Sequence, residues 1–202
     1  MPEIINPLWL LGLVGLAAYL IGSIPFGVVI ARVMGLGDLR QIGSGNIGAT
    51  NVMRTGNKLA GVLTFLLDAA KGAIAALIAW ALLGEDAAQT AALAAFLGHL
   101  YPVFLGLKGG KGVATFVGTA LALAWPVGLV ICAIWAVTFK LSRISSLSAL
   151  IAAGLAPVLA LVLGYGSMVG LFVILAAMIF WKHAENIHRL RLGTEARFSR
   201  KD

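Results

Sequence analysis

A run of glycine and short polar residues covers Gly43–Asn51, and Arg54 follows it closely. Glycines let successive backbone N–H groups line an anion-binding hollow, and a guanidinium suits phosphate. The run also fits the Gly-x-Gly-x-x-Gly pattern of dinucleotide sites, but no strand precedes it and Asp68 lies in an apolar run, which excludes that interpretation. A flexible loop of turn residues remains the alternative. The candidate phosphate-binding residues are Ser44, Gly45, Asn46, Gly48, Thr50, Asn51 and Arg54.

A second cluster, Lys108–Thr115, reads KGGKGVAT. It is not a Walker A loop, because Gly112 stands where Ser or Thr must follow Lys111. A glycine-rich turn that leads into a helix N-terminus still offers unpaired N–H groups to an anion. A lysine anchor at the membrane surface would explain the lysines but not the glycines. The candidate substrate-binding residues are Lys108, Gly109, Gly110, Lys111, Gly112 and Thr115.

The third cluster begins at His183 and continues through Asn186 and Arg189 to Glu195. Residues three apart share a helix face, so the imidazole, amide and guanidinium can bind a phosphate or direct a proton. An interfacial basic tail that binds anionic lipid is the alternative. Ser146, on a short polar segment, is a further candidate.

Other polar residues lie within apolar runs. We interpret Asp68 and Lys71, an i,i+3 pair, as an internal structural ion pair, since charges in a span are usually paired or functional. His99 is expected to pack and hydrogen-bond rather than catalyse. Gly22–Gly27, which contains a proline, is expected to kink the first span. The single Cys132 and the lack of metal-ligand spacing exclude a disulfide framework and make zinc unexpected.

Composition sets the environment of these clusters. The 202 residues are 60% hydrophobic and only 11% charged, whereas soluble domains are about a quarter charged. We therefore predict an all-α integral membrane protein that forms a single domain over residues 1–202. In a membrane protein, we interpret the net charge of +7 as evidence about membrane orientation and anionic partners rather than about nucleic-acid binding. No Lys or Arg precedes Leu8, so the first apolar run is expected to be a retained span and not a signal peptide.

Seven transmembrane helices are expected, because a span needs about 20 apolar residues. The region Gly112–Leu141 is too long for one helix and is divided at Trp125-Pro126. The last run is short but can extend into His183–Ile187. The remaining predicted spans are Leu8–Val33, Leu59–Leu83, Ala87–Leu107, Leu147–Leu163 and Ser167–Trp181.

The distribution of basic residues gives the orientation. With seven spans and the N-terminus outside, the outer segments contain acidic residues but no Lys or Arg, and the C-terminus is cytoplasmic. A six-span arrangement would expose a basic segment to the outside. All three polar clusters then lie on the cytoplasmic face, where they can converge. The predicted inner basic residues are Arg32, Arg40, Arg54, Lys58, Lys108, Lys111, Lys140, Arg143, Lys182, Arg189, Arg191, Arg197, Arg200 and Lys201.

The three clusters, in their order and spacing, resemble the signature motifs of the bacterial membrane-embedded acyl-phosphate:glycerol-3-phosphate acyltransferases. The quoted motifs are SGNxGATN from Ser44, KGGKGVAT from Lys108 and HxxNIxRLxxGxE from His183. The resemblance implies transfer of a fatty acyl group from acyl phosphate to glycerol 3-phosphate, giving lysophosphatidate and phosphate, as the first step of phospholipid synthesis. It also implies a multi-pass protein of the bacterial inner membrane with a cytoplasmic active site.

The donor expectation agrees with the sequence, because no histidine starts the His-x4-Asp signature of acyl-CoA-using enzymes. No cofactor is expected. The expected partners are the two substrates and the lipid bilayer, and the enzyme that supplies acyl phosphate is a candidate protein partner. A transporter or flippase of a phosphorylated solute is the alternative, although all polar clusters lie on one face and no repeat is visible.

We expect the catalytic residues to be Ser44, Asn46, Lys111 and His183, and the remaining candidates to bind substrate. Ser44, Asn46, Thr50 and the glycines are assigned to acyl phosphate. The residues assigned to glycerol 3-phosphate are Arg54, Lys111, His183 and Asn186. Ser146 could join either. His183 is the only plausible side-chain base in the motifs. We favour a substrate-assisted route in which a phosphate oxygen takes the proton and His183 binds.

Overall fold

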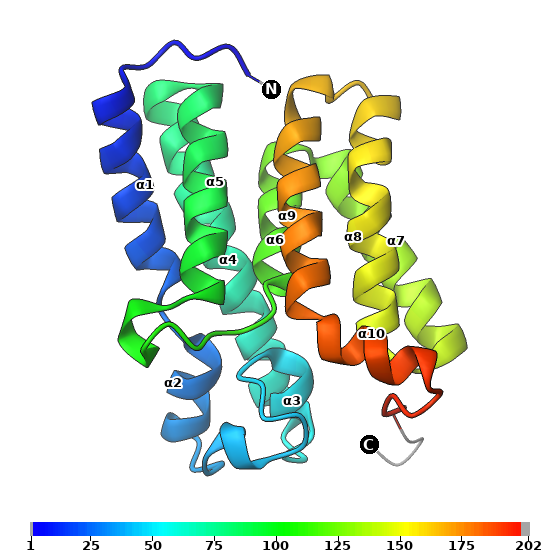
Figure 1. The fold of residues 1–202 in the computed structure, drawn as a ribbon. Helices are drawn as coiled ribbons and strands as arrows, with labels where there is room; N and C mark the ends of the chain where they lie inside the picture. Colours follow the sequence, from blue (N-terminus) through cyan, green and yellow to red (C-terminus); the bar gives the residue numbers. More distant parts are fainter. Residues whose placement is uncertain (1, 199–202) are drawn as a thin grey trace. The chain divides into compact units, whose positions relative to one another are not determined.

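The computed structural model describes residues 2–198, all of whose regular elements are helices (Figure 1). Arg200 and Lys201 of the predicted inner tail lie outside the described residues. The chain forms two compact units. The N-terminal unit comprises Glu3–Leu123, and the C-terminal unit begins at Ala124 and also includes Pro2.

The N-terminal unit contains six α-helices and two short 3₁₀ helices. Its central member is α4, which packs against all five other α-helices of the unit. The helices and short 3₁₀ turns are α1 Leu8–Gly22, α2 Phe26–Val33, η1 Leu39–Gln41, α3 Ala49–Met53, α4 Lys58–Leu83, α5 Glu85–Leu100, η2 Val103–Leu105 and α6 Val113–Leu123.

Small side chains hold these helices close together. One core cluster consists only of alanines from α1, α4 and α5, among them Ala18, Ala79 and Ala91. A methyl group at Gly98 would overlap the backbone carbonyl of Tyr19. The hydrophobic effect does not drive helices together within lipid. Their association depends instead on van der Waals packing, which small residues strengthen by letting the backbones approach closely. The many large apolar side chains that remain exposed suit a lipid environment.

The first span is broken where the sequence predicted a kink. Helix α1 ends at Gly22 and α2 begins at Phe26, with Pro25 between them. Proline has no N–H group and cannot continue the hydrogen-bond ladder. The carbonyl of Ile24, which the break leaves without a helical partner, accepts a 2.8 Å hydrogen bond from Lys71 Nζ on α4.

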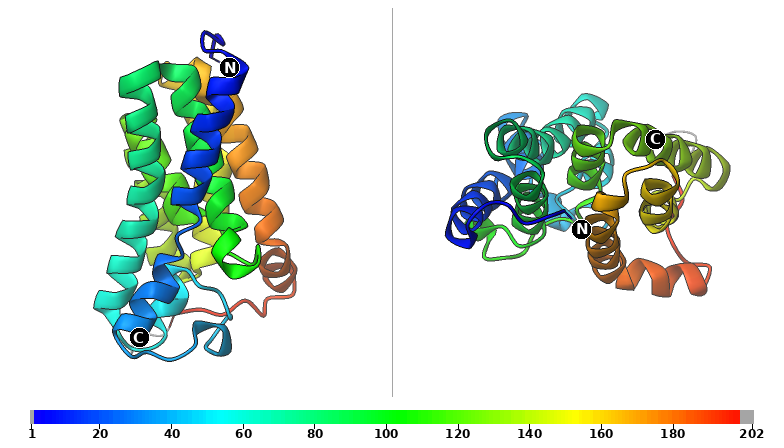
Figure 2. Two further views of the ribbon diagram at one scale, coloured as in Figure 1. Left: turned by 90° about the vertical axis from the view of Figure 1, so that its left-hand side faces the viewer. Right: turned by 90° about the horizontal axis from the view of Figure 1, so that it is seen from above.

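The C-terminal unit is a row of three long helices followed by a short one. Helix α8 packs against both α7 and α9 (Figures 1 and 2). The chain after α10 returns to the start of α8, where the Phe198 N–H donates a 2.9 Å hydrogen bond to the Arg143 carbonyl. The elements are α7 Trp125–Ser142, α8 Ser145–Val162, η3 Gly166–Met168, α9 Val169–Lys182 and α10 Ala184–Arg191.

Within residues 2–198, five helical segments are long and apolar enough to cross a membrane, and a bent sixth can be added. The predicted division at Trp125-Pro126 is confirmed, since α7 starts there. Helix α6 has only 11 residues, or about 16 Å at 1.5 Å per residue, and falls short of a roughly 30 Å hydrocarbon core. The extension of the last run past His183 is helical but bent, because the chain turns by 64° between α9 and α10. The seven-span count stays a prediction.

Candidate active site

The loop of the first motif is organised by the amide of Asn51, which is 1% exposed. Its Nδ2 group donates to the carbonyls of Leu39 and Asn46, at 2.9 and 2.7 Å. Its Oδ1 accepts from the backbone N–H of Ser44 at 3.0 Å and from the Ser44 hydroxyl at 3.3 Å. An asparagine amide offers two donor hydrogens and two acceptor sites, so these four contacts use it fully. In this structure Asn51 supports the loop, and its predicted substrate contact stays a prediction.

Ser44 and Arg54 lie on the outer side of this loop and are both exposed. Gly43, with φ of +53°, turns the chain before Ser44, a conformation that favours glycine. The Arg54 side chain passes directly over Gly43, because a Cβ there would lie 2.8 Å from Arg54 Cδ. A hydroxyl, a guanidinium and the loop backbone thus lie close together around Gly43, and groups of these kinds suit phosphate oxygens. Asn46 Oδ1 accepts a 3.1 Å bond from the Gly48 N–H.

The glycines of the second motif lie tightly against the end of α5. The N–H groups of Gly109 and Gly110 donate to the carbonyls of Leu100 and His99. A methyl group at Gly110 would overlap the His99 ring, and one at Gly112 would overlap Phe96. Close packing is therefore one physical reason for these glycines, in addition to the predicted backbone binding of an anion.

The polar side chains of the second motif divide into two groups. Lys108 is exposed and Lys111 is half-buried, so both lie toward the surface of the loop. Thr115 is fully buried, and its hydroxyl donates a 2.9 Å hydrogen bond to the backbone carbonyl of Asp68. The predicted substrate contact of Thr115 stays a prediction, while its backbone contact fixes the start of α6 against α4.

The third motif is organised by Glu195, whose side chain is 9% exposed. Its Oε1 accepts hydrogen bonds from the Ser146 hydroxyl at 2.7 Å and from the Asn186 amide at 2.5 Å. Its Oε2 accepts from Arg189 Nε at 2.7 Å. Ser146, which could have joined either cluster, therefore lies with the third motif. The structure brings Ser146, Asn186, Arg189 and Glu195 together in the C-terminal unit.

Burial raises the pKa of the Glu195 carboxyl, but the hydrogen bonds from Ser146, Asn186 and Arg189 and the charge of Arg189 lower it more strongly. The net result is a pKa below the ordinary value of 4.5. Hydrogen bonds to a carboxylate favour its charged form. Glu195 is thus an anion at neutral pH that orients donors, which fits an organising role better than that of a proton donor.

His183 occupies the bend between α9 and α10 and is 3% exposed. Its Nδ1 lies 2.8 Å from the Ile179 carbonyl. Because a carbonyl only accepts, Nδ1 carries a proton in this contact, and Nε2 is the nitrogen that changes protonation. Sequence reasoning found no carboxylate to orient His183. The Ile179 carbonyl, which helps to orient the ring, is a backbone group that a search for acidic partners cannot find.

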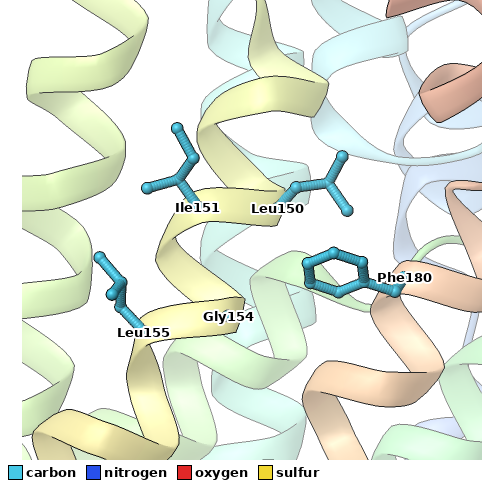
Figure 3. Close-up of a pocket in the computed structure, with 5 residues that line it drawn as sticks. All are labelled: Leu150, Ile151, Gly154, Leu155 and Phe180. Carbon is cyan, nitrogen blue, oxygen red and sulfur yellow. The ribbon is translucent and has the colours of Figure 1, made fainter. Parts of the chain in front are cut away.

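A shallow apolar groove in the C-terminal unit begins beside this cluster (Figure 3). Leu150 lies one helical turn after Ser146 on α8, and Phe180 lies just before His183 on α9. The lining is completed by Ile151, Gly154 and Leu155. A second apolar groove, between α4 and α6, is lined by Leu77, Trp80, Ala81 and Ala122.

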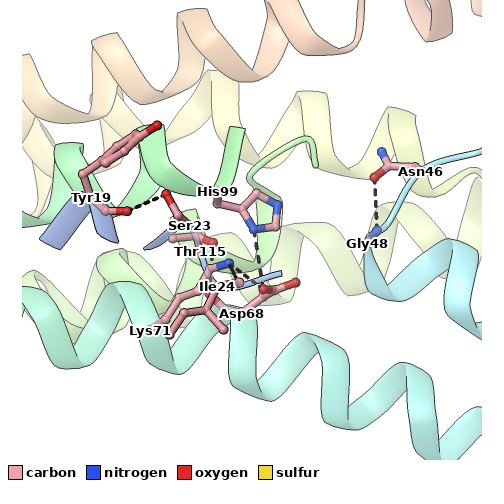
Figure 4. Close-up of polar contacts among 9 residues, drawn as sticks. All are labelled: Tyr19, Ser23, Ile24, Asn46, Gly48, Asp68, Lys71, His99 and Thr115. Atoms are coloured by element: carbon pink, nitrogen blue, oxygen red, sulfur yellow. Dashed lines mark hydrogen bonds and ion pairs between the residues drawn. The ribbon is translucent and has the colours of Figure 1, made fainter. Parts of the chain in front are cut away.

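The predicted ion pair inside the second span is confirmed, with Lys71 Nζ 2.7 Å from Asp68 Oδ1. Sequence reasoning missed that His99 joins it from α5, with Nδ1 3.5 Å from the same oxygen (Figure 4). The available signal was that these three ionisable residues all lie within apolar runs. Among the described residues, no three His, Cys, Asp or Glu side chains group closely enough to hold a metal ion.

Comparison with known proteins agrees with these motifs over nearly the whole chain. The profile of the glycerol-3-phosphate acyltransferase family matches residues 12–193. A glycerol-3-phosphate acyltransferase of Jannaschia sp. (strain CCS1) is 63% identical over 95% of this chain and 94% of its own. One of Cereibacter sphaeroides (strain ATCC 17025 / ATH 2.4.3) is 62% identical over 100% of this chain and 96% of its own.

Two crystal structures of PlsY (YgiH), an integral membrane glycerol 3-phosphate acyltransferase, have the same fold. The glycerol 3-phosphate form matches with a TM-score of 0.89 and 44% identity, over 94% of this chain and 96% of that one. The lysophosphatidic acid form matches with a TM-score of 0.86 and 41% identity, over 94% and 95%. This chain therefore belongs to the glycerol-3-phosphate acyltransferase family.

Proposed function

We propose that the protein transfers a fatty acyl group from acyl phosphate to glycerol 3-phosphate, giving 1-acyl-glycerol 3-phosphate and inorganic phosphate. The observation that carries this proposal is the full-length likeness to a protein solved in both a glycerol 3-phosphate and a lysophosphatidic acid form. These two ligands are the acceptor and the product of one acyl transfer. Loops that carry exposed hydroxyl, guanidinium and ammonium groups suit substrates that both contain phosphate.

In the proposed reaction, a hydroxyl oxygen of glycerol 3-phosphate attacks the acyl carbonyl carbon. The new ester C–O bond forms, the bond between the carbonyl carbon and the phosphate oxygen breaks, and the hydroxyl proton goes to a phosphate oxygen. Because phosphate is a competent leaving group, the protein mainly supplies proximity and charge stabilisation. Ser44, Asn46 and Lys111 are proposed to stabilise the reacting groups.

We assign His183 to binding the phosphate of glycerol 3-phosphate rather than to general-base catalysis. In its protonated form the ring would donate through Nε2 while Nδ1 keeps its bond to the Ile179 carbonyl. The Ile179 carbonyl holds the ring in an orientation that suits a ligand role. The leaving phosphate can accept the hydroxyl proton itself.

Acyl phosphate is the proposed donor, since the chain lacks the His-x4-Asp signature of acyl-CoA-using acyltransferases. The test is to supply purified protein with labelled glycerol 3-phosphate and either acyl phosphate or acyl-CoA. Label should enter lipid with acyl phosphate alone. Turnover with acyl-CoA in the absence of acyl phosphate would overturn the donor assignment, and no lipid product with either donor would overturn the proposed function.

The proposed location is the bacterial inner membrane, with the N-terminus outside and the active site on the cytoplasmic face. The support is the absence of Lys and Arg from every proposed outer segment. In the seven-span arrangement, the short α6 is proposed to serve as a span that is partly sheltered by α4 and α5, which both contact it.

The apolar groove between α8 and α9 is proposed to hold the acyl chain. Its position next to Ser146 and His183 supports this assignment, because the acyl carbonyl must lie close to the phosphate-binding groups. The groove between α4 and α6 adjoins no residue of the three motifs.

A further inference from the structure

Three ionisable side chains lie together in the interior of the N-terminal unit, outside the three motifs. Asp68 and Lys71 on α4 are 2% and 4% exposed, and His99 on α5 is 5% exposed. Burying charged groups is costly, and replacing a buried ion pair by apolar residues is often neutral or stabilising. Packing alone therefore does not explain why this unit contains such a group.

The contacts of this group, called here the buried triad, connect α4, α5 and the break of the first span (Figure 4). Asp68 Oδ1 lies 2.7 Å from Lys71 Nζ and 3.5 Å from His99 Nδ1. Lys71 Nζ also donates a 2.8 Å hydrogen bond to the carbonyl of Ile24, in the break of the first span. The hydrogen bond to Ile24 is directional, and the two ion pairs place both cationic partners at one oxygen of Asp68. Together these contacts hold the end of α5 and the break of the first span against α4.

One end of the buried triad leads to the first motif. The break at Ile24 is followed directly by α2, and a methyl group at Gly27 on α2 would overlap the carbonyl of Ile47. Ile47 lies within the first motif and is buried. A displacement of the break would therefore move the backbone against which the loop around Ser44 rests.

The other end leads to the second motif. Gly110 lies against the His99 ring on its Nε2 side, and its N–H donates a 3.1 Å hydrogen bond to the His99 carbonyl. The hydroxyl of Thr115 donates to the carbonyl of Asp68 at 2.9 Å. Both sides of the loop that carries Lys111 thus rest on residues of the triad.

We propose that Asp68, Lys71 and His99 are positioning residues that set the first and second motif loops at a fixed distance from each other. They do not touch substrate in this assignment. They act through Ile24 on one side and Gly110 on the other. The charges are retained because one hydrogen bond and two ion pairs that meet at Asp68 fix one arrangement of the two loops, which apolar packing at the same place would not do. The kinetic part of this inference rests on the proposed acyltransferase function, whereas the geometric part does not.

The geometric test measures the distance between the two loops directly. Cys132 is replaced by serine, and spin labels are attached to cysteines at Gln41 and Phe104, which are exposed positions beside the two motifs. The key variant replaces the whole pair, Asp68→Leu with Lys71→Met, because removing one partner alone leaves an unpaired buried charge. Thr64→Val is the matched control, since Thr64 is also buried on α4 but bonds only within the helix, to the Ala60 carbonyl.

The paired variant should fold and show a shifted or broadened distance distribution, whereas Thr64→Val should match the parent protein. A second pair of variants keeps the test independent of the ion pair. His99→Gln retains a donor toward Asp68 and should keep the parent distribution, while His99→Leu should not. Unchanged distributions in both the paired variant and His99→Leu would overturn the positioning role.

The kinetic test uses the same variants with acyl phosphate and glycerol 3-phosphate. A displacement of roughly 1 Å at a catalytic group costs about 10²-fold in rate. His99→Leu should therefore lose about 10²-fold in kcat/KM for glycerol 3-phosphate at unchanged unfolding temperature, and His99→Gln should largely retain it. Equal activity of both His99 variants would overturn the assignment. An inactive parent protein would instead refute the proposed function, and the distance measurement would still decide whether the triad positions the loops.

Discussion

The hydroxyl of Ser146 donates a 2.7 Å hydrogen bond to the carboxylate of Glu195, although the two residues lie 49 positions apart. The same carboxylate accepts hydrogen bonds from Asn186 and Arg189. A single acidic side chain thus fixes a serine, an amide and a guanidinium relative to one another. Because three side chains donate hydrogen bonds to it, the Glu195 carboxylate fixes the geometry of the cluster.

Replacing Glu195 by glutamine should lower acyltransferase activity by about 10- to 100-fold, since a hydrogen bond to a charged group contributes about 1.5–3 kcal/mol. The amide keeps the shape of the carboxyl but places an NH₂ group where donors now point. Glu185→Gln is the matched control, because Glu185 lies 3.8 Å from the same Arg189 and its side chain is 92% exposed. Steady-state kinetics and unfolding temperature should be measured for both. Equal effects of the two substitutions would contradict the organising role of Glu195.

The free energy of unfolding should depend on pH because the Glu195 carboxyl has different pKa values in the folded and unfolded protein. Its pKa in the folded protein lies below the ordinary value of 4.5, so the unfolded chain binds a proton first as pH falls. The stabilisation is fully present above pH 4.5 and is lost as pH falls through the lower folded pKa. The difference in unfolding temperature between the parent protein and Glu195→Gln should therefore shrink below that pH. A difference that stays constant on acidification would show that the charge of Glu195 contributes nothing.

The positions of the long apolar helices were predicted well from the sequence, because a run of apolar residues marks a segment that can lie in lipid. The predicted span Leu59–Leu83 agrees with α4 within one residue, and proline correctly indicated the start of α7. The bend at His183 was missed, since no glycine or proline marks it and the apolar pattern continues through Trp181. Local composition shows where a helix is apolar, but tertiary contacts decide where it turns.

The site was predicted less completely than the spans. Residue types identified the three motifs, yet sequence alone did not separate residues that face a ligand from those that hold a loop. Asn51 and Thr115 are buried among backbone partners, whereas Ser44 and Arg54 are exposed. The contact between Ser146 and Glu195 and the one between Asp68 and His99 join separate helices. No helical periodicity relates such residues, and only the fold brings them together.

The seven-span arrangement predicts which loops face outward. Single cysteines at Glu85 and Gly164, in a Cys132→Ser background, should react with an impermeant thiol reagent added to intact cells. A cysteine at Thr55, in the loop that follows α3, should react only after the membrane is opened. Ser199, also expected inside, lies outside the described residues. Labelling of Thr55→Cys from outside would refute the orientation.

The groove between α8 and α9 should determine which acyl chains are accepted. A Cβ at Gly154 would lie 3.5 Å from Phe180 Cζ, an ordinary contact, so Gly154→Leu should fold while filling part of the groove. Each methylene that loses its apolar contact costs about 0.8 kcal/mol, so loss of two lowers kcat/KM for long-chain acyl phosphate by about tenfold. Short-chain donors should be less affected. Ala122→Leu, in the groove between α4 and α6, is the control, and an equal loss in that variant would contradict the assignment.

Replacing His183 by glutamine distinguishes the two schemes of proton transfer. If His183 binds the phosphate of glycerol 3-phosphate, KM for that substrate should rise while kcat changes less, because the lost interaction is present in both the ground state and the transition state. His183→Arg should then partly restore binding, since it supplies another donor. If His183 is the general base, kcat should fall by about 10²–10⁴-fold with KM little changed. We expect the binding pattern, because the ring is oriented by the Ile179 carbonyl and the leaving phosphate can take the proton. An enzyme with normal KM and a thousandfold lower kcat, about 4 kcal/mol in transition-state stabilisation, would assign the proton transfer to His183 instead.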